Sequence, residues 1–228
     1  MKNLMIYINP SRHFDDEHTR YAPIQIDNSL KYWKPEEILL VTNFPYKYHD
    51  IKACEVPDNL FFKFWRTSSK INAIVYLLEN KILTESAWMH DFDAFQVNPF
   101  KLRLKQDLGL TDYGWKPKIN TGSFFFKPTA LDIFKWIKKD MYKRQAAEED
   151  ILWILYKENF RNIRARCQKL NITYNLGKRN VEFNLQIADK PIRVFHFHPY
   201  RESLFQKFKP HLPDSLAKLI YEKSPNLS

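Results

Sequence analysis

The chain has 228 residues, of which 44% are hydrophobic and 16% aromatic, a composition that indicates a packed globular protein and excludes a disordered one. Its formal net charge of +10 favours an anionic partner such as a nucleotide, a nucleic acid, an acidic glycan or a membrane surface, although lysine-rich solvated faces would give the same charge. The two cysteines form no disulfide framework or metal motif and no hydrophobic run is long enough for a transmembrane segment, so we expect a cytoplasmic protein.

Short hydrophobic runs and one helical repeat define the first half of the chain. The runs at residues 4–8 and 38–42, with a weaker one at 53–56, predict strands. Between residues 69 and 83, isoleucine, valine and leucine recur at helical spacing, which predicts a helix. A further hydrophobic run at 87–90 predicts a central strand.

The second half continues this alternation. We predict a strand at 118–127, a helix that begins at Thr129, a helix at 147–157, and short strands near 172–174 and 192–198. Strands that alternate with helices predict an α/β fold with a mostly parallel central sheet and helices on both faces.

Three stretches show no such regularity. Residues 24–34 are mixed and predict no element, and residues 96–117, interrupted by proline and glycine, are expected to be irregular. The proline-punctuated tail, residues 201–228, is expected to form a helical segment that covers the same single domain.

Asp91 and Asp93 directly follow the strand predicted at 87–90. Carboxylates at the end of a buried strand are costly unless a cation meets them, and hard oxygen ligands suit magnesium and manganese. An Asp-x-Asp by itself is more often a turn or a solvated face, so its interpretation depends on the rest of the chain.

Three other polar clusters stand at the ends of predicted elements or interrupt them. Asn120-Thr121-Gly122 interrupts an aromatic strand, where the glycine lets a ligand approach the backbone. Glu148-Glu149-Asp150 begins a helix, where acidic residues also suit the helix dipole. His196-Phe197-His198 ends the last hydrophobic strand, and its two histidines share one side of that strand.

In this order, the clusters resemble the pattern of the GT-A family of nucleotide-sugar glycosyltransferases. That pattern has a first-strand loop that holds the nucleotide, an Asp-x-Asp, an x-Glu-Asp helix and a C-terminal metal-binding histidine. The matching positions here are Asn9 to Arg12, Asp91 and Asp93, Glu149 and Asp150, and His196 or His198. The resemblance covers residues 4–200, and the first loop lacks the glycine that is often found there.

The resemblance implies a GT-A-like (Rossmann-like) catalytic domain at residues 1–200 that moves a sugar from a UDP-sugar-like donor to an acceptor hydroxyl. A Mn²⁺ or Mg²⁺ cofactor would neutralise the charge on the departing diphosphate, and a histidine ligand suits Mn²⁺ better. Asp93 would be the stronger metal ligand, while Asp91 would contact the metal site or the ribose. Asp150, ahead of Glu149, would be the general base of an inverting reaction, and a retaining mechanism is the alternative.

Other residues are candidates for donor or acceptor binding. Lys70, at the start of a predicted helix, would meet a phosphate unless it is simply exposed. Asn120 and Thr121 would hydrogen-bond the donor sugar or the acceptor, unless they cap a turn. Trp115 would stack on a sugar or base, and Arg164, in a basic run, would contact an acceptor backbone unless it is solvated.

The sequence leaves the acceptor open. A hydroxymethylated base in DNA is weakly preferred because it would explain the net charge and the basic run. The alternatives are a cell-surface glycan or lipid-linked acceptor, a nucleotidyltransferase of related architecture, and a non-enzymatic nucleic-acid-binding protein. Without a metal, an aspartate pair in a positive groove would oppose phosphate binding, so the last alternative ranks lowest.

Overall fold

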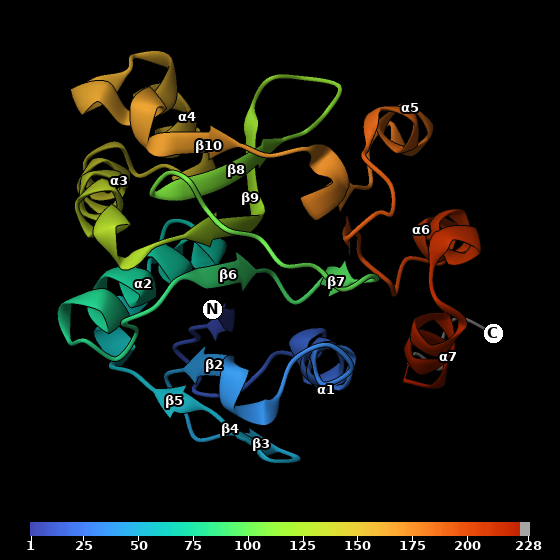
Figure 1. Cartoon of the computed structure of the whole chain (residues 1–228). Coiled ribbons are helices and arrows are strands. Elements are labelled where there is room, and N and C mark those ends of the chain that lie inside the picture. Colours follow the sequence, from blue (N-terminus) through green and yellow to red (C-terminus); the bar gives the residue numbers. More distant parts are fainter. Residues whose placement is uncertain (224–228) are drawn as a thin grey trace.

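The computed structural model describes residues 1–223, which fold around a seven-stranded central sheet (Figure 1). In order across the sheet, the strands are β10 (Cys167–Lys169), β8 (Leu108–Asp112), β9 (Ile119–Phe126), β6 (Ala87–His90), β1 (Lys2–Tyr7), β2 (Ile38–Thr42) and β5 (Cys54–Glu55). Within this sheet β9 runs antiparallel to both neighbours, and the other strands run parallel to one another. The mostly parallel sheet predicted from the sequence is confirmed.

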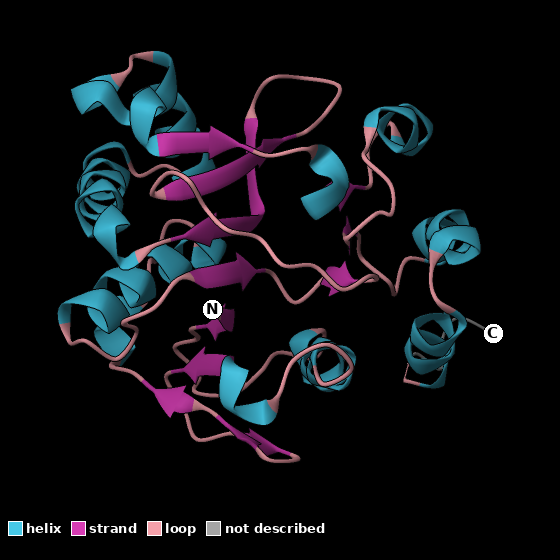
Figure 2. Cartoon of the chain, viewed as in Figure 1, coloured by secondary structure: helices cyan, strands magenta, loops and turns pink. Residues whose placement is uncertain are grey.

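Helices lie on both sides of the strands, as predicted (Figure 2). The four that pack on the central sheet are α1 (His18–Ser29), α2 (Ser69–Glu79), α3 (Leu131–Arg144) and α4 (Glu148–Lys157). Leu4 and Ile6 of β1 belong to the core shared with α2, α3 and α4, whereas Met5 and Tyr7 belong to the core shared with α1. Because successive strand residues point to opposite faces, a strand covered on both faces needs hydrophobic residues on both, as in residues 4–7 of β1.

A second layer packs on the α1 side. It contains the small sheet β11 (Leu176–Gly177), β12 (Val194–His196) and β7 (Ala94–Gln96), and the helices α5 (Val181–Ile187), α6 (Glu202–Phe208) and α7 (Asp214–Glu222). Phe197 stacks on Phe208 of α6 with ring centroids 4.4 Å apart, and Leu216 of α7 joins the same hydrophobic cluster. The predicted covering segment ends at residue 228, and its residues 224–228 lie outside the described part of the chain.

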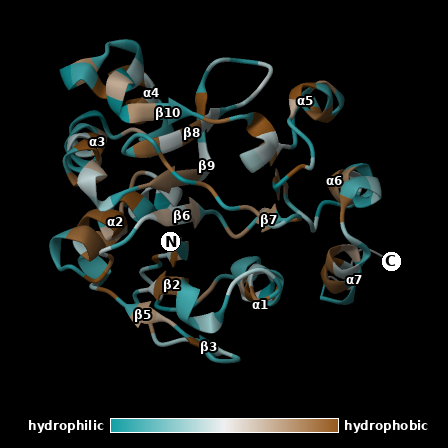
Figure 3. Cartoon of the chain, viewed as in Figure 1, coloured by the Kyte–Doolittle hydropathy of each residue, from teal (hydrophilic) through white to brown (hydrophobic). Residues whose placement is uncertain are grey.

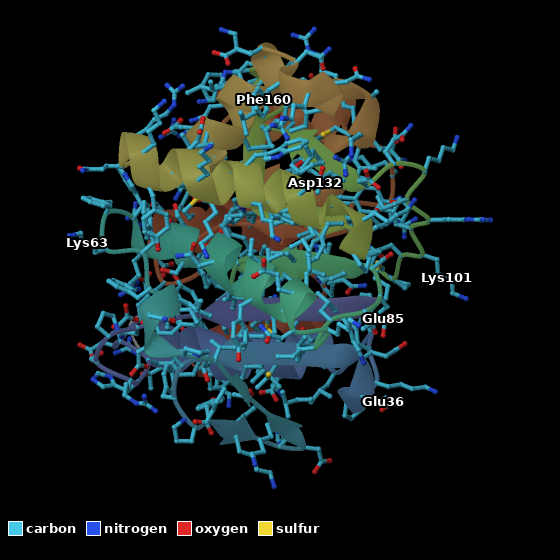
Figure 4. All side chains as sticks on the ribbon, turned by 90° about the vertical axis from the view of Figure 1, so that its left-hand side faces the viewer. Glu36, Lys63, Glu85, Lys101, Asp132 and Phe160 are labelled. Carbon is cyan, nitrogen blue, oxygen red and sulfur yellow. The ribbon has the colours of Figure 1, made fainter. Side chains whose placement is uncertain are left out.

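The remaining elements are short. They are the hairpin β3 (Lys47–Tyr48) and β4 (Ile51–Lys52), and the 3-10 helices Pro35–Glu37, Asp58–Leu60, Arg66–Ser68, Pro128–Ala130, Phe160–Arg166, Ile172–Tyr174 and Lys209–His211. Figure 4 looks onto the α2 and α3 face, where Asp132 of α3 lies 2.8 Å from Arg166. Arg166 also lies 2.6 Å from Asp107, so it links the β10 edge of the sheet to α3.

Three stretches differ from what the sequence indicated. The mixed stretch at 24–34 holds the end of α1, where Gln25 and Asn28 are buried and donate to the carbonyls of Ala94 and Gln96 at 2.8 and 3.0 Å. These buried amides, whose NH2 groups donate to backbone carbonyls, hide the helical period of the hydrophobic residues. Residues 96–117 include β8, and residues 172–174 form a 3-10 helix instead of a strand.

Hydrophobic residues, brown in Figure 3, lie along the central strands and on α2. In the part of the chain described by the structure, no helix has both the length and the hydrophobicity needed to cross a membrane.

The core beneath α3 gives a stability prediction. Phe126 of β9 is fully buried and lies 5.0 Å, ring centroid to centroid, from Phe134 of α3. We expect Phe126→Ala to lower the free energy of unfolding by about 3–5 kcal/mol, because it removes buried area and leaves a cavity. Urea unfolding followed by circular dichroism measures this. Phe183→Ala is the matched control because Phe183 is 47% exposed, and an equal loss in both variants would contradict the packing described here.

Candidate active site

The end of β6 is anchored from two neighbouring elements. The amide of Asp91 donates to the Gly122 carbonyl of β9 at 2.8 Å. His90, one residue earlier, accepts from Gln25 at Nδ1 (2.9 Å) and donates from Nε2 to Asn3 Oδ1 (2.7 Å). Burial lowers the pKa of His90 to about 3, so its ring is neutral and serves to hold β6 against β1 and α1. The backbone position from which both aspartates of the Asp-x-Asp extend is therefore fixed.

Asp93 lies between two histidines from a distant part of the chain. One carboxylate oxygen is 3.2 Å from His196 Nε2, and the other is 3.0 Å from His198 Nδ1. The amide of Phe197 donates to the Asp93 carbonyl at 3.0 Å, which continues the antiparallel pairing of β12 with β7. The structure thus brings together the Asp-x-Asp and the late histidines that the sequence analysis selected.

Asn175 sets the orientation of the His196 ring. Its Nδ2 contacts the carbonyls of Asn120 and Ser123 at 3.3 Å each, so its Oδ1 faces His196 Nδ1 at 3.0 Å. His196 therefore carries its proton on Nδ1 when neutral, and the lone pair of Nε2 points toward Asp93. A histidine ligand of a metal is usually held in this way by a second hydrogen bond.

Asp91, Asp93 and His196 have the geometry and chemistry of a metal site. One ligand atom from each lies within 4.8 Å of the others. Two hard carboxylate oxygens with one imidazole nitrogen suit Mn²⁺ and, less well, Mg²⁺. The residues present therefore fit the divalent ion that the sequence pattern implies.

The charges of these groups are strongly coupled. Burial raises the pKa of Asp91, and the positive charges of Lys70 and His196 only partly offset this effect. Burial also acts to raise the pKa of Asp93, but His196 and His198 outweigh it and hold the pKa well below its usual range. Asp93 is therefore a carboxylate that is already stabilised by neighbouring positive charge.

Lys70 is buried and paired, rather than exposed. Its Nζ lies 2.9 Å from Asp91, 3.1 Å from Glu148 and 3.0 Å from the carbonyl of Thr121. Burial acts to lower its pKa, but the two carboxylates outweigh this and raise it, so Lys70 is charged. Glu148 also accepts hydrogen bonds from the hydroxyls of Ser68 and Thr121. The exposed-lysine interpretation is excluded, and contact with a donor phosphate stays a prediction.

Gly122 allows His196 to reach its position. A Cβ at residue 122 would lie 1.9 Å from Cε1 of the His196 ring, a separation that no side chain can adopt. The sequence pattern predicts that this glycine admits a ligand to the backbone. In the structure it admits the ring of the candidate metal ligand.

Two cavities meet at this centre. The first, of about 340 Å³, is lined by residues from the ends of β1 and β6 and the start of α2, including Tyr7, Arg66, Lys70 and Asp91. The second, of about 390 Å³, is lined by residues that include Tyr113, Glu149, Lys178 and Arg179. Asp93 and His196 line both cavities. A ligand that spans the centre would therefore have one part in each cavity.

The two predicted general bases occupy different places. Glu149 lines the second cavity, accepts the Tyr113 hydroxyl at 2.8 Å, and lies 3.0 Å from Lys118. Asp150 has a side chain that is 52% exposed, pairs with Lys118 at 2.6 Å, and lines neither cavity.

Several predicted binding residues lie outside the two cavities. Asn9 is buried and donates to the carbonyl of His13 at 2.8 Å, and Arg12 pairs with Asp58 at 2.8 Å. Trp115 is 37% exposed on the β8–β9 loop. Arg164 donates to the carbonyls of Tyr156 and Lys157, which end α4. By contrast, Asn120 lines the second cavity and accepts from the Gly122 amide at 3.0 Å.

Four residues of the site were not selected from the sequence. Glu148 was explained by the helix dipole alone, and its buried partners come from elements distant in the chain. Asn175 gave no signal. Lys178 and Arg179 directly follow β11, so a basic pair after a strand end was the available signal.

No protein-family model matches the sequence, and no curated protein sequence matches it. In structure the chain is similar to a glycosyltransferase involved in the glycosylation of the major capsid of PBCV-1, with 17% identity, a TM-score of 0.53, and coverage of 85% of this chain and 93% of that chain. It is also similar to the galactosyltransferase LgtC in complex with donor and acceptor sugar analogues, with 12% identity, a TM-score of 0.60, and coverage of 95% and 99%.

A third similar structure is the glycosyltransferase GlyE of Streptococcus pneumoniae TIGR4, with 12% identity, a TM-score of 0.60, and coverage of 97% of this chain and 62% of that chain. Identities this low show the fold alone. The chain has the GT-A fold of glycosyltransferases, as the order of its motifs predicted.

The Gly122–His196 contact gives a prediction about metal binding. We expect Gly122→Ala to displace the His196 ring and to weaken Mn²⁺ binding by about tenfold or more, as measured by isothermal titration calorimetry. Gly177→Ala is the matched control, because a Cβ there would meet its nearest atom at 3.8 Å. Equal Mn²⁺ affinity in the folded Gly122→Ala variant and the wild type would refute the role of His196 as a ligand.

Proposed function

We propose that this protein is a metal-dependent glycosyltransferase that moves a sugar from a nucleotide-sugar donor, UDP-sugar-like, to an acceptor hydroxyl. The observation that carries the proposal is the Asp91, Asp93 and His196 cluster between two cavities on a GT-A fold. The first cavity lies at the end of β1, which is where the nucleotide is held in the family pattern. The second cavity would then hold the transferred sugar and the acceptor.

The residues present suit the chemistry of this transfer. When bound, a divalent ion supplies positive charge that stabilises the departing nucleoside diphosphate. Asp91 and Asp93 would hold that ion through carboxylate oxygens, and His196 through Nε2. His198, which lies 3.0 Å from the carboxylate oxygen of Asp93 that His196 does not contact, would orient this carboxylate or replace His196 as the ligand. Mn²⁺ is preferred over Mg²⁺ because of the imidazole ligand.

Glu149 is better placed than Asp150 to act on the acceptor. Its carboxylate lines the second cavity with Asp93, whereas Asp150 pairs with Lys118 at the surface. In an inverting transfer, Glu149 would take the proton of the attacking hydroxyl. In a retaining transfer, the same carboxylate would face the reacting sugar.

The acceptor and the alternatives expected from the sequence stay predictions. A hydroxymethylated base in DNA, a glycan and a lipid-linked acceptor all offer a hydroxyl. Binding to DNA would weaken steeply with rising salt, which separates it from binding to a neutral glycan. A nucleotidyltransferase would release pyrophosphate from a nucleoside triphosphate instead of a nucleoside diphosphate from a nucleotide sugar.

The first test is a panel of nucleotide sugars incubated with the protein and Mn²⁺, with free nucleoside diphosphate as the measured product. We expect release from one donor, its loss on chelation with EDTA, and its recovery with Mn²⁺ more than with Mg²⁺. Asp93→Asn should lower the rate at least about a hundredfold, because it removes a charged ligand from the site that meets the diphosphate. Asp50→Asn, on the exposed β3–β4 turn, is the control. Full activity in Asp93→Asn would exclude the proposed metal site.

A second test separates the two acidic residues. If Glu149 is the base, Glu149→Gln lowers kcat for donor hydrolysis by about 10²–10⁴-fold, while Asp150→Asn changes it little. Each substitution keeps the size of its side chain and removes one negative charge. A larger effect at Asp150 would return the role of base to that residue.

A further inference from the structure

The second cavity contains an excess of positive charge that the transfer reaction itself does not use. Lys116, Lys118, Lys178 and Arg179 line it, against the carboxylates of Asp93 and Glu149. Both carboxylates already have close partners: the two histidines lie beside Asp93, and Lys118 pairs with Glu149. Lys116, Lys178 and Arg179 form no ion pair with either carboxylate.

These three cations lack carboxylate partners among residues 1–223. No ion pair joins Lys116, Lys178 or Arg179 to an acidic side chain of the described chain. Lys116 instead lies over the rings of Tyr113 and Trp115, at 4.6 and 4.9 Å from their centroids. Burial lowers the pKa of Lys178, and the charge of Asp93 acts against this shift while those of Arg201 and Arg179 add to it. Neighbouring cations that form no ion pair repel one another, and an anion bound between them would relieve this repulsion.

The two segments that carry these cations are fixed relative to one another. Buried Asn184 donates from Nδ2 to the carbonyls of Tyr113 and Arg179, at 3.2 and 3.0 Å. It therefore ties the β8–β9 loop, which carries Lys116, to the segment after β11, which carries the basic pair. Figure 1 shows this loop extending toward α5, the helix of Asn184. The positive charges are thus held in place before any ligand binds.

Gly114 makes this approach possible. Its φ of +76° is a conformation that other residues rarely adopt, and a Cβ there would lie 2.2 Å from Asn184 Oδ1. The contact between the loop and α5 is therefore built into the backbone, rather than depending on flexible surface side chains.

We propose that the acceptor is an anionic sugar whose carboxylate or phosphate group is bound by Lys116, Lys178 and Arg179 in the second cavity. This inference rests on the proposed transfer reaction, because it names the acceptor class of the same site. The cavity of about 390 Å³ matches one or two sugar units, and the cations surround that space rather than forming the extended stripe that would follow a nucleic-acid backbone.

The test compares probes that differ in charge alone or in class. Binding to the full chain with Mg²⁺ and UDP is measured by ligand-observed NMR for glucose, glucuronic acid, glucose 6-phosphate and an oligonucleotide that contains 5-hydroxymethylcytosine. We expect glucuronic acid or glucose 6-phosphate to bind at least about fivefold more tightly than glucose, as one well-placed ion pair would give. Which of the two binds better distinguishes a carboxylate from a phosphate.

The double variant Lys178→Ala/Arg179→Ala should abolish this preference while keeping the affinity for glucose. Lys139→Ala/Lys143→Ala, which removes the same charge from the exposed face of α3, should keep the preference. Equal binding of the charged and neutral sugars, or tighter binding of the oligonucleotide that requires Lys178 and Arg179, would overturn the proposal. The proposal would also be overturned if the KM of the double variant for the donor rose by as large a factor as its affinity for the charged sugar fell. The cations would then hold the donor diphosphate. Failure of the transfer reaction itself appears separately, as absence of nucleoside diphosphate release.

Discussion

One buried lysine joins the three elements on which the site depends. Lys70 of α2 lies between Asp91, at the end of β6, and Glu148, at the start of α4, and the side chains of Lys70 and Glu148 are each about 95% buried. Removing one partner from a buried ion pair leaves an uncompensated charge, at a typical cost of about 3–5 kcal/mol. Each member of this trio therefore holds the other two in place. The position of Asp91, and with it the geometry of the centre, depends on this arrangement.

Lys70, Asp91 and Glu148 also determine the net charge beside the candidate metal site. Two carboxylates and one ammonium leave a net negative charge beside Asp93, and burial raises the pKa of Asp91 despite the nearby lysine. A divalent cation held by Asp91, Asp93 and His196 would supply the missing positive charge. Asn175 accepts from Nδ1 of His196, so Nε2 is the ring nitrogen that would face the ion, and a positively charged His196 would release its Nε2 proton when the ion binds. The negative charge of the carboxylates and the orientation of the His196 ring thus both favour a divalent cation.

The sequence was sufficient to predict the residues whose role follows from their position on a strand end. Asp91 and Asp93 are of this kind, because the alternation of strands and helices places carboxyl ends of parallel strands together. The sequence also selected His196 and His198 but could not choose between them, since β12 belongs to the separate small sheet. It was not sufficient for Lys70 and Glu148, because each finds its partner through tertiary packing and each has an ordinary explanation at a helix start. The same limit applies to α1, whose buried amides look polar in the sequence but donate from their NH2 groups to carbonyls of β7. Arg164 was predicted to contact an acceptor because it is basic, whereas in the structure it donates to a carbonyl at the end of α4.

The acidic run at the start of α4 shows how one motif takes three roles. Successive residues of a helix point about 100° apart, so Glu148, Glu149 and Asp150 cannot share one environment. Glu148 points into the core and meets Lys70, Glu149 faces the second cavity beside Tyr113, and Asp150 reaches Lys118 at the surface. The helix dipole favours all three equally and so cannot distinguish them. Lys118 contacts both Glu149 and Asp150. Asp150 therefore affects the cavity from the surface, because it shares the lysine that would otherwise neutralise Glu149 alone.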